Sequence, residues 1–174
     1  MVPASIPPVA TSLISQAPFD SPIGRLWVAV SPRGLVGIWR GDSPDPESGG
    51  PRGMDPAAAG SAIAELQAYF AGRLRIFSLA LDLRAAGPFD RAVWAAAREI
   101  PYGETASYGE LAAMAGYPRA ARAAGNAMAR CPLSPVVPCH RVIHADGSIG
   151  GWGSDTWVKR WLLDLERGHV GLTG

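Results

Sequence analysis

The stretch Ala85-Ala86-Gly87-Pro88, which ends in glycine and proline, punctuates this chain and divides the sequence into two halves of different build. Before it, segments with the alternation typical of strands flank one segment with helical spacing, over Ala57–Ala71. After it, apolar residues recur every three or four positions, which is typical of helices. We therefore expect an α+β fold, with a flexible tail over 1–18, an N-terminal α/β domain over 19–87 and a C-terminal domain over 88–174.

The N-terminal half is expected to begin with a β-hairpin. Strands are predicted over 19–30 and Leu35–Trp39, joined by a turn of Ser, Pro, Arg and Gly. We expect the first strand to present four apolar residues on one face: Ile23, Leu26, Val28 and Val30. The pattern then predicts a loop over Gly41–Pro56, a helix over Ala57–Ala71 and a further strand over Ile76–Leu83. We assign the apolar residues of this half to a core and find no chemistry in it.

The residue pattern of the C-terminal half predicts helices. Pro88 begins one that extends to Ile100, and Ser107 forms a capping box with Glu110 at the start of the next. A helix over 119–129 follows after a short turn, so these two neighbours make a helix-turn-helix pattern. The last helix is expected over Trp157–Glu166. Two short helices around a turn are a weak signature by themselves.

The helix over 119–129 is nearly without bulk, because alanine or glycine occupies most of its positions. The larger residues expected to project from it are Arg119, Arg122, Asn126, Met128 and Arg130. No Asp or Glu occurs between Leu111 and Ala145, so this region suits a polyanion such as DNA. Small residues also let two helices pack closely, and an arginine face can simply be solvated, so the residues alone leave these alternatives open.

A cysteine follows the extended run Pro135-Val136-Val137-Pro138. Pro138 fixes φ and removes a backbone donor, so the chain can turn at Cys139 and hold a thiol at the edge of a pocket. His140 and Arg141 could supply the base or the positive surroundings that favour the reactive thiolate. The alternative is that Cys139 is a small buried hydrophobe, as many free cysteines are.

Composition limits the possibilities further. The 174 residues are 48% hydrophobic and 18% charged, which is typical of a globular protein. No apolar run reaches the eighteen or so residues of a membrane helix, and Met1–Gln16 lacks the basic start of a signal peptide, so we expect a cytoplasmic protein. Two cysteines and three histidines give neither a disulfide scaffold nor a zinc-ligand spacing, and we expect no metal and no cofactor.

Several motifs resemble those of the O6-alkylguanine-DNA alkyltransferase family, in its order and spacing. They are Ile100-Pro101-Tyr102-Gly103, Ser107-Tyr108-Gly109-Glu110-Leu111-Ala112, Ala121-Arg122-Ala123-Ala124-Gly125, Pro138-Cys139-His140-Arg141-Val142 and Lys159-Arg160-Trp161-Leu162-Leu163-Asp164-Leu165-Glu166. The match is dense from Phe89 to Glu166 and only general before Phe89. The resemblance implies an RNase H-like N-terminal domain and a winged-helix-like C-terminal domain that carries the helix-turn-helix and the active-site loop.

The resemblance also implies a single-turnover alkyl transfer. In that reaction Cys139 attacks the alkyl group of O6-alkylguanine, and His140 takes the thiol proton through a water. Glu166 orients His140, and Tyr108 donates a hydrogen bond to guanine N3. The residues implied for the substrate pocket are Val142, through its carbonyl, Trp152, Gly153, Ser154 and Lys159, the last of which could instead be a solvated cation at the start of a helix.

For DNA, the resemblance implies that the helix over 119–129 lies in the minor groove. Arg122 matches the arginine that replaces the flipped nucleotide in the stack, and Met128 matches the position that supports it. The other residues implied at the DNA surface are Ala121, Gly125, Arg119 and Arg130. The implied partner is double-stranded DNA containing O6-alkylguanine, bound by a monomer, with no membrane involved.

Two positions depart from the family pattern. Cys131 stands eight residues before Cys139, where the family usually has an asparagine that helps to brace the active-site turns together with structural residues such as Arg141. A thiol is a poor hydrogen-bonding group beside an amide, so the rigidity of these turns is in question. Trp152 and Gly153 replace the more common Tyr-Ser, which could change the tolerance for larger alkyl groups.

Two other functions are considered. A non-catalytic relative that binds the lesion and signals other repair would lack the nucleophile, but Cys139 is present. A Cys/His hydrolase would use the same three side chains on an acyl substrate, but would leave Arg122 and Tyr108 without a role.

Overall fold

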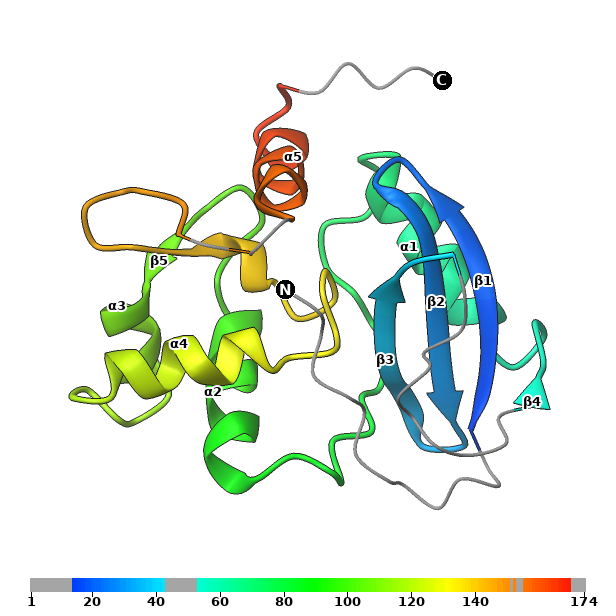
Figure 1. The fold of residues 1–174 in the computed structure, drawn as a ribbon, viewed down its shortest axis with the longest axis horizontal. Helices are drawn as coiled ribbons and strands as arrows, with labels where there is room; N and C mark the ends of the chain where they lie inside the picture. Colours follow the sequence, from blue (N-terminus) through cyan, green and yellow to red (C-terminus); the bar gives the residue numbers. More distant parts are fainter. Residues whose placement is uncertain (1–13, 43–52, 151, 153–154, 170–174) are drawn as a thin grey trace. The chain divides into compact units, whose positions relative to one another are not determined.

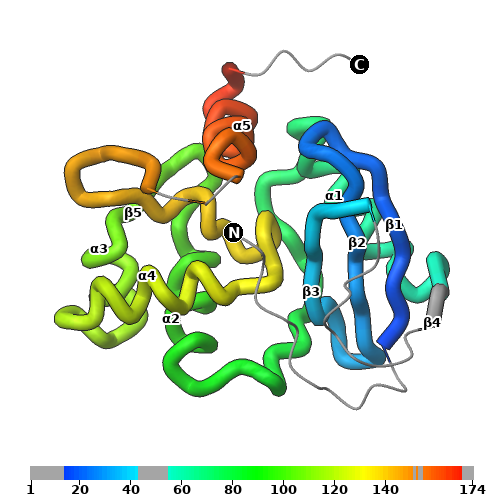
Figure 2. Tube along the Cα trace, viewed as in Figure 1, coloured from blue at the N-terminus to red at the C-terminus, as the bar shows by residue number. Residues whose placement is uncertain are grey.

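The computed structural model describes residues 14–42, 53–150, 152 and 155–169. The chain divides into two compact units between Ala85 and Ala86, and each is described by itself. The ribbon in Figure 1 and the trace in Figure 2 show a sheet-containing N-terminal unit and a mainly helical C-terminal unit. The predicted α+β fold is confirmed.

The N-terminal unit is built on a four-stranded sheet with the order β3-β2-β1-β4. Its strands are β1 (Ser15–Ser21), β2 (Gly24–Ser31), β3 (Gly34–Arg40) and β4 (Gly53–Met54). The first three are antiparallel neighbours, and β4 pairs in parallel with the start of β1. Helix α1 (Gly60–Phe70) lies against the sheet in Figure 1, and its Phe70 ring is centred 6.0 Å from that of Phe19.

The first predicted strand is wrong in its extent. Residues 19–30 form the end of β1, a turn and most of β2, and Ile23 lies in that turn. In a strand, side chains two positions apart share a face. Ile23 is odd-numbered, whereas Leu26, Val28 and Val30 are even-numbered, so one face of a strand could not have carried all four. Strand β1 begins at Ser15, so the tail expected over 1–18 wrongly includes the first residues of this strand.

Two further expectations for this unit need correction. The predicted loop over Gly41–Pro56 contains strand β4, while its residues 43–52 lie outside the described residues. The predicted strand over Ile76–Leu83 is reduced to a single bridge between Leu35 and Leu81. Hydrogen bonds from Leu35 N to Ala80 O and from Asp82 N to Leu35 O, 2.9 and 2.8 Å long, tie this extended segment to β3. The predicted helix is confirmed as α1, which begins at Gly60.

The C-terminal unit contains the predicted helices. They are α2 (Pro88–Arg98), α3 (Tyr108–Met114), α4 (Ala121–Ala129) and α5 (Thr156–Glu166), with a 3-10 turn η2 (Cys139–Arg141). Pro88 is the first residue of α2, and the capping box between Ser107 and Glu110 is present at the start of α3. The Trp94 indole donates to the Ala127 carbonyl over 2.9 Å and so joins α2 to α4.

A short parallel ladder positions the helix-turn-helix against the cysteine turn. Strand β5 (Ala106–Ser107) pairs with β6 (Val142–Ile143), so the start of α3 lies beside the residues that follow η2. This ladder, only two residues long on each side, was not apparent in the sequence. No helix among the described residues is long and apolar enough to cross a membrane.

The turn between β2 and β3 gives a test of the N-terminal unit. Gly34 has φ of 141°, and a Cβ at this position would collide with the carbonyl oxygen of Ala80. We expect Gly34→Ala to lower the free energy of unfolding by about 2–4 kcal/mol in urea titrations, because it adds backbone strain to a steric clash. Gly60→Ala is the control: Gly60 begins α1 with open space around it, so its stability should be unchanged or slightly higher. Equal losses in the two variants would show that the turn at Gly34 has no special need for glycine.

Candidate active site

The chain turns sharply at Cys139, as the preceding proline predicts. Pro138 has ψ of 67°, and residues 139–141 form the 3-10 turn, in which the Arg141 amide donates to the Pro138 carbonyl over 3.0 Å. The loop before it is held by a 2.9 Å bond from the Val137 amide to the Leu133 carbonyl. Cys139 is 5% exposed, so its thiol is almost enclosed by protein in the free state.

The His140, Arg141 and Glu166 side chains form a buried cluster. His140 Nε2 lies 2.7 Å from Glu166 Oε1, and the Arg141 guanidinium donates to both oxygens of Glu166 over 2.8 and 2.9 Å. Arg141 also donates to the Ile100 carbonyl over 2.7 Å, and the Gly103 amide donates to Glu166 over 3.1 Å. The structure therefore brings together the predicted histidine and glutamate, and it adds Arg141 as the counter-charge.

The electrostatics of this cluster favour a neutral histidine beside an ionised carboxylate. Burial opposes ionisation of Glu166, but the hydrogen bonds from His140 and Arg141 outweigh it and hold the Glu166 pKa well below its ordinary value. Burial lowers the pKa of His140, although Glu166 acts in the opposite direction. A neutral ring that donates from Nε2 to Glu166 has its basic lone pair on Nδ1, which is the protonation state required of a general base.

Lys159 is buried beside the cysteine turn. Its side chain is fully enclosed, and Nζ donates to the Val142 carbonyl over 2.6 Å. Burial lowers the Lys159 pKa to about 8, while the negative charge of Cys139 acts to raise it. The alternative of a solvated cation is therefore wrong. The Val142 carbonyl predicted to bind substrate already accepts one hydrogen bond, and its second lone pair is the one available to another donor.

Tyr108 stands at the first position of α3, close to the cysteine. Burial raises the pKa of its hydroxyl, and the charge of Cys139 raises it further, so the group keeps its proton and can donate. Its ring is centred 5.4 Å from that of His144, an exposed residue that the sequence reasoning did not select. The position of His144 depends on the turn at 144–148, in which its amide bonds to Ser148 O, and no spacing rule indicates it.

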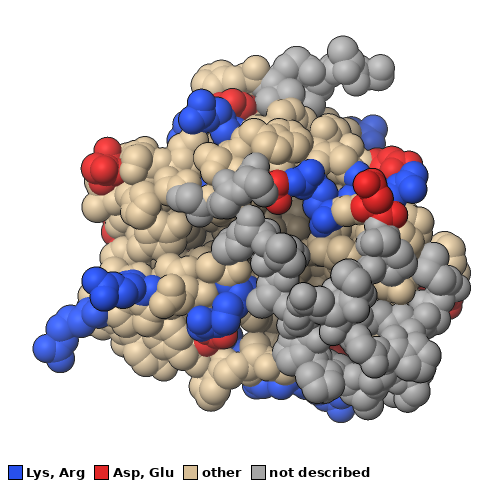
Figure 3. Space-filling model, viewed as in Figure 1, with Lys and Arg blue, Asp and Glu red and all other residues tan. Residues whose placement is uncertain are grey.

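The second helix of the helix-turn-helix has an inner face and an exposed face. Arg119, before α4, and Arg122 are exposed, and on the face drawn in Figure 3 basic side chains stand out over α4. Arg130 is bound to Asp90, with a shortest contact of 2.7 Å, so its charge is partly neutralised. Met128 is 4% exposed and does not project as expected. Gly125 faces protein as well, because a Cβ there would lie 3.5 Å from the Tyr108 ring.

The remaining predicted residues fall into three groups. Trp152 is half-buried, and Lys159 Nζ lies 6.0 Å from its ring centre, whereas Gly153 and Ser154 lie outside the described residues. Ala121 is the first residue of α4 and is partly exposed. Cys131 follows α4, is 7% exposed, and its amide donates to Met128 O over 3.2 Å.

Within the described ranges, no three His, Cys, Asp or Glu side chains gather in a way that could hold a metal ion.

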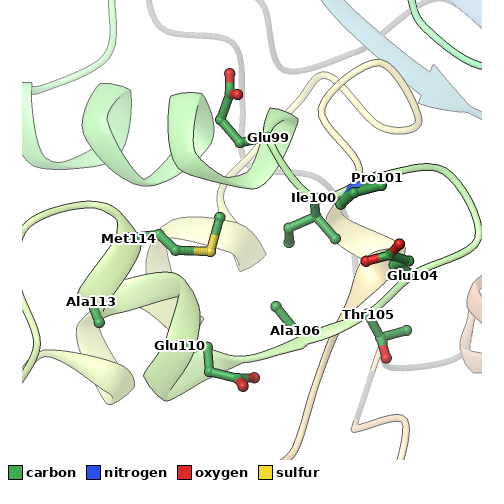
Figure 4. A pocket seen from close by; sticks show the side chains of 9 residues that line it. All are labelled: Glu99, Ile100, Pro101, Glu104, Thr105, Ala106, Glu110, Ala113 and Met114. Atoms are coloured by element: carbon green, nitrogen blue, oxygen red, sulfur yellow. The ribbon is translucent and has the colours of Figure 1, made fainter.

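A separate hollow of about 440 Å³ lies between the end of α2 and the start of α3. Figure 4 shows Ile100 and Met114 directed into it, with Glu104 and Glu110 at its edge. None of the residues predicted for catalysis or DNA binding lines this hollow. Carboxylates at its edge repel phosphate, so we do not place the DNA there.

The buried cluster gives a test by stability. We expect Glu166→Gln to lower the free energy of unfolding by about 3–5 kcal/mol at pH 7, because it leaves the Arg141 charge buried without its counter-charge. The Glu166 pKa lies below its ordinary value of 4.5, so the wild type should lose this contribution as the pH falls from there, and the variant should not. Urea titrations against pH measure both effects.

Glu99→Gln serves as the control, since Glu99 is exposed at the end of α2, and its effect should stay within about 0.5 kcal/mol. Equal stability of the Glu166 and Glu99 variants would show that the cluster contributes nothing to the fold.

Comparison with known proteins agrees with this geometry. The family model of the 6-O-methylguanine DNA methyltransferase DNA-binding domain matches residues 88–168, and that of the ribonuclease-like domain of the same family matches residues 14–83. A methylated-DNA–protein-cysteine methyltransferase of Mycolicibacterium paratuberculosis is 45% identical over 157 residues, which cover 90% of this chain and 94% of that protein. Its counterpart in Mycobacterium tuberculosis H37Rv is 43% identical over 158 residues, or 91% and 95% of the two chains.

Solved structures give the same result. The crystal structure of the M. tuberculosis O6-methylguanine methyltransferase superposes with a TM-score of 0.82 at 41% identity, covering 92% of this chain and 97% of that one. The M. tuberculosis protein crystallised in complex with DNA superposes with a TM-score of 0.78 at 42% identity, covering 90% and 93%. Since the two matched domains together take in most of the sequence and the relatives align over nearly their whole length, the chain belongs to the 6-O-methylguanine DNA methyltransferase family.

Proposed function

We propose that the protein repairs O6-alkylguanine in double-stranded DNA by transferring the alkyl group once and irreversibly to Cys139. The observation that carries the proposal is the placement of the Cys139 turn. It lies next to the His140–Glu166 pair on one side and is joined by the β5–β6 ladder to the helix-turn-helix on the other. The relatives named methylated-DNA–protein-cysteine methyltransferase support this reaction, and the M. tuberculosis complex supports DNA as the partner.

The first step is activation of the thiol. His140 follows Cys139 directly, and side chains at adjacent positions rarely meet head-on, so a water carries the proton from the Cys139 sulfur to His140. The neutral histidine can accept it, because the Glu166 carboxylate stabilises the imidazolium that results. Arg141 keeps Glu166 ionised through its two hydrogen bonds. Lys159, buried near the thiolate, adds a positive charge that favours the anionic nucleophile.

The second step is displacement at carbon. The thiolate forms a bond to the alkyl carbon, the bond from that carbon to guanine O6 breaks, and its electron pair stays on the guanine. A donated hydrogen bond from the Tyr108 hydroxyl to N3 helps the ring to carry that charge, and burial of Tyr108 keeps the donor protonated. The product is a thioether, which has no carbonyl for water to attack. The protein is therefore consumed by a single reaction.

The damaged base must leave the duplex to reach Cys139, because the thiol is almost enclosed within the protein. We assign Arg122, which is exposed on α4, to the space that the flipped nucleotide vacates, with α4 in the minor groove. Arg119 contacts the phosphates, and so does Arg130, whose charge is partly neutralised by Asp90. Met128 and Gly125 lie on the inner face of α4, which packs against the rest of the protein. We assign Trp152, which is half-buried, to the wall of the pocket that receives the base, and the family resemblance gives Gly153 and Ser154 the same role.

The protein is proposed to act as a monomer in the cytoplasm, which keeps Cys139 and Cys131 reduced. The lesion-binding alternative has less support, since the nucleophile and its base are both in place. The hydrolase alternative leaves the arginines around α4 without a role, and it predicts repeated turnover on an ester.

Cys139→Ala tests the nucleophile. With a duplex that carries methyl-labelled O6-methylguanine, we expect the wild type to gain one equivalent of label at residue 139, as located by mass spectrometry. The variant should gain none, while its affinity for the duplex is retained, because the DNA-binding arginines are intact. Label transfer in the variant would place the nucleophile elsewhere, and binding without transfer in the wild type would favour the lesion-binding alternative.

Arg122→Ala tests base flipping. We expect repair of the duplex to slow by about tenfold to a hundredfold, because flipping costs a few kcal/mol that the inserted arginine offsets. Reaction with the free base O6-methylguanine needs no flipping and should keep its rate. Arg98→Ala removes an exposed arginine from α2 and should alter neither rate. Equal slowing on the duplex and the free base would remove the proposed role of Arg122.

A further inference from the structure

The proposed mechanism gives no role to His144, whose ring adjoins that of Tyr108. The two ring centres lie 5.4 Å apart, and the ring planes are tilted by 58°. Aromatic rings at this separation attract each other beyond the effect of the area that they bury. His144 is nevertheless exposed, so its contact with Tyr108 is not the result of enclosure in a core.

The β5–β6 ladder accounts for this contact. Ser107 and Ile143 are the last paired residues of its two parallel strands. Tyr108 and His144 follow them directly, so they are the next residues on the two sides of the ladder and start from neighbouring positions. The chain then turns tightly, and the His144 amide donates to Ser148 O over 2.9 Å. The backbone on both sides of the ring pair is therefore fixed.

The loop that begins at His144 also reaches the hydroxyl end of Tyr108. A Cβ added at Gly150 would lie 2.9 Å from His144 Nε2 and 3.5 Å from the Tyr108 oxygen, so this loop brings both groups to one place. The rest of the Tyr108 ring has other neighbours. A Cβ at Gly125 of α4 would approach its edge, and Lys159 Nζ lies 5.9 Å from its centre. The loop thus lies at the end of the side chain that carries the proton.

We propose that His144 is a positioning residue for the alkyl transfer, whose ring packs against Tyr108 and holds the phenol hydroxyl in the direction of guanine N3. Assistance to a leaving group requires the donor to be placed to within about 0.5 Å, so a tyrosine ring with more freedom to rotate donates less effectively. The inference rests on the proposed function, because that function gives the hydroxyl its acceptor. The ring contact itself is present without DNA.

The test compares a ring with a methyl group at position 144. Single-turnover methyl transfer is timed on two duplexes, one with O6-methylguanine and one with O6-methyl-3-deazaguanine, in which C–H replaces N3 and the Tyr108 hydroxyl has no acceptor. We expect His144→Ala to slow transfer from O6-methylguanine by about threefold to tenfold and to leave transfer from the deaza base unchanged. His144→Phe keeps a ring and should keep the wild-type rate on both duplexes.

His169→Ala is the matched control, since His169 is an exposed histidine after α5, and it should change neither rate. Equal slowing on both duplexes by His144→Ala would overturn the proposal, because the histidine would then act on the pocket or on the DNA and not through N3. A phenylalanine variant as slow as the alanine variant would also overturn it, because the effect would then belong to the nitrogen atoms of the imidazole.

A second measurement separates this inference from the proposed function. Protein with ¹³C-labelled tyrosine is studied by NMR without DNA, and Tyr108→Phe identifies the Tyr108 signal among the four tyrosines. We expect the order parameter of this ring to fall in His144→Ala and to keep its value in His144→Phe. That result without methyl transfer by the wild type would contradict the proposed function alone. Transfer by the wild type with an unchanged order parameter in His144→Ala would contradict the role of His144 alone.

Discussion

One buried carboxylate holds the C-terminal unit together. Glu166 accepts hydrogen bonds from His140, from two nitrogens of Arg141 and from the Gly103 amide. These partners lie on the cysteine turn and on the loop after α2, so a single side chain near the end of α5 fixes three segments that are distant in sequence. The desolvation of such a group is compensated only when its hydrogen-bonding capacity is filled, as it is here.

The same arrangement couples folding to chemistry. Arg141 neutralises Glu166, Glu166 holds the His140 ring, and His140 directly follows Cys139 in the chain. The cationic side chains of Arg141 and Lys159 are both buried within this region and each is bound to a carbonyl, of Ile100 and Val142 respectively. Charges that are costly to bury therefore surround the one sulfur whose ionised form the proposed reaction requires.

Patterns that depend on near neighbours in sequence were predictable. The capping box at Ser107 and the proline at the start of α2 follow from local rules, and both are present. The boundary expected between the two halves followed from the glycine and proline at positions 87 and 88. The pairing of His140 with Glu166 came from the family resemblance, because no rule of spacing joins two residues that lie 26 positions apart.

What failed depended on tertiary contacts. Every residue from Leu26 to Val30 is buried, so alternation could not indicate which face of β2 meets the core. The two-residue strands β4 to β6 are held by pairing with distant segments and carry no signal of their own. From the sequence, Met128 and Lys159 cannot be told apart from exposed helix residues. Only the residues that pack around them in the fold show that both side chains are buried.

Because α4 lies against Tyr108, the positions of this helix differ in how freely they can be changed in a redesign. A Cβ at Gly125 would lie 3.5 Å from the aromatic ring whose hydroxyl is proposed to assist the leaving group, which is an ordinary van der Waals contact, so alanine fits there and a larger side chain has this ring as its neighbour. Randomised libraries that seek altered recognition of DNA can vary the solvent-facing positions 123 and 126, which are exposed, and keep Arg122 for its proposed role in base flipping. A library that places larger side chains at position 125 would mix changes in recognition with changes around Tyr108, and its survivors could not be assigned to either cause.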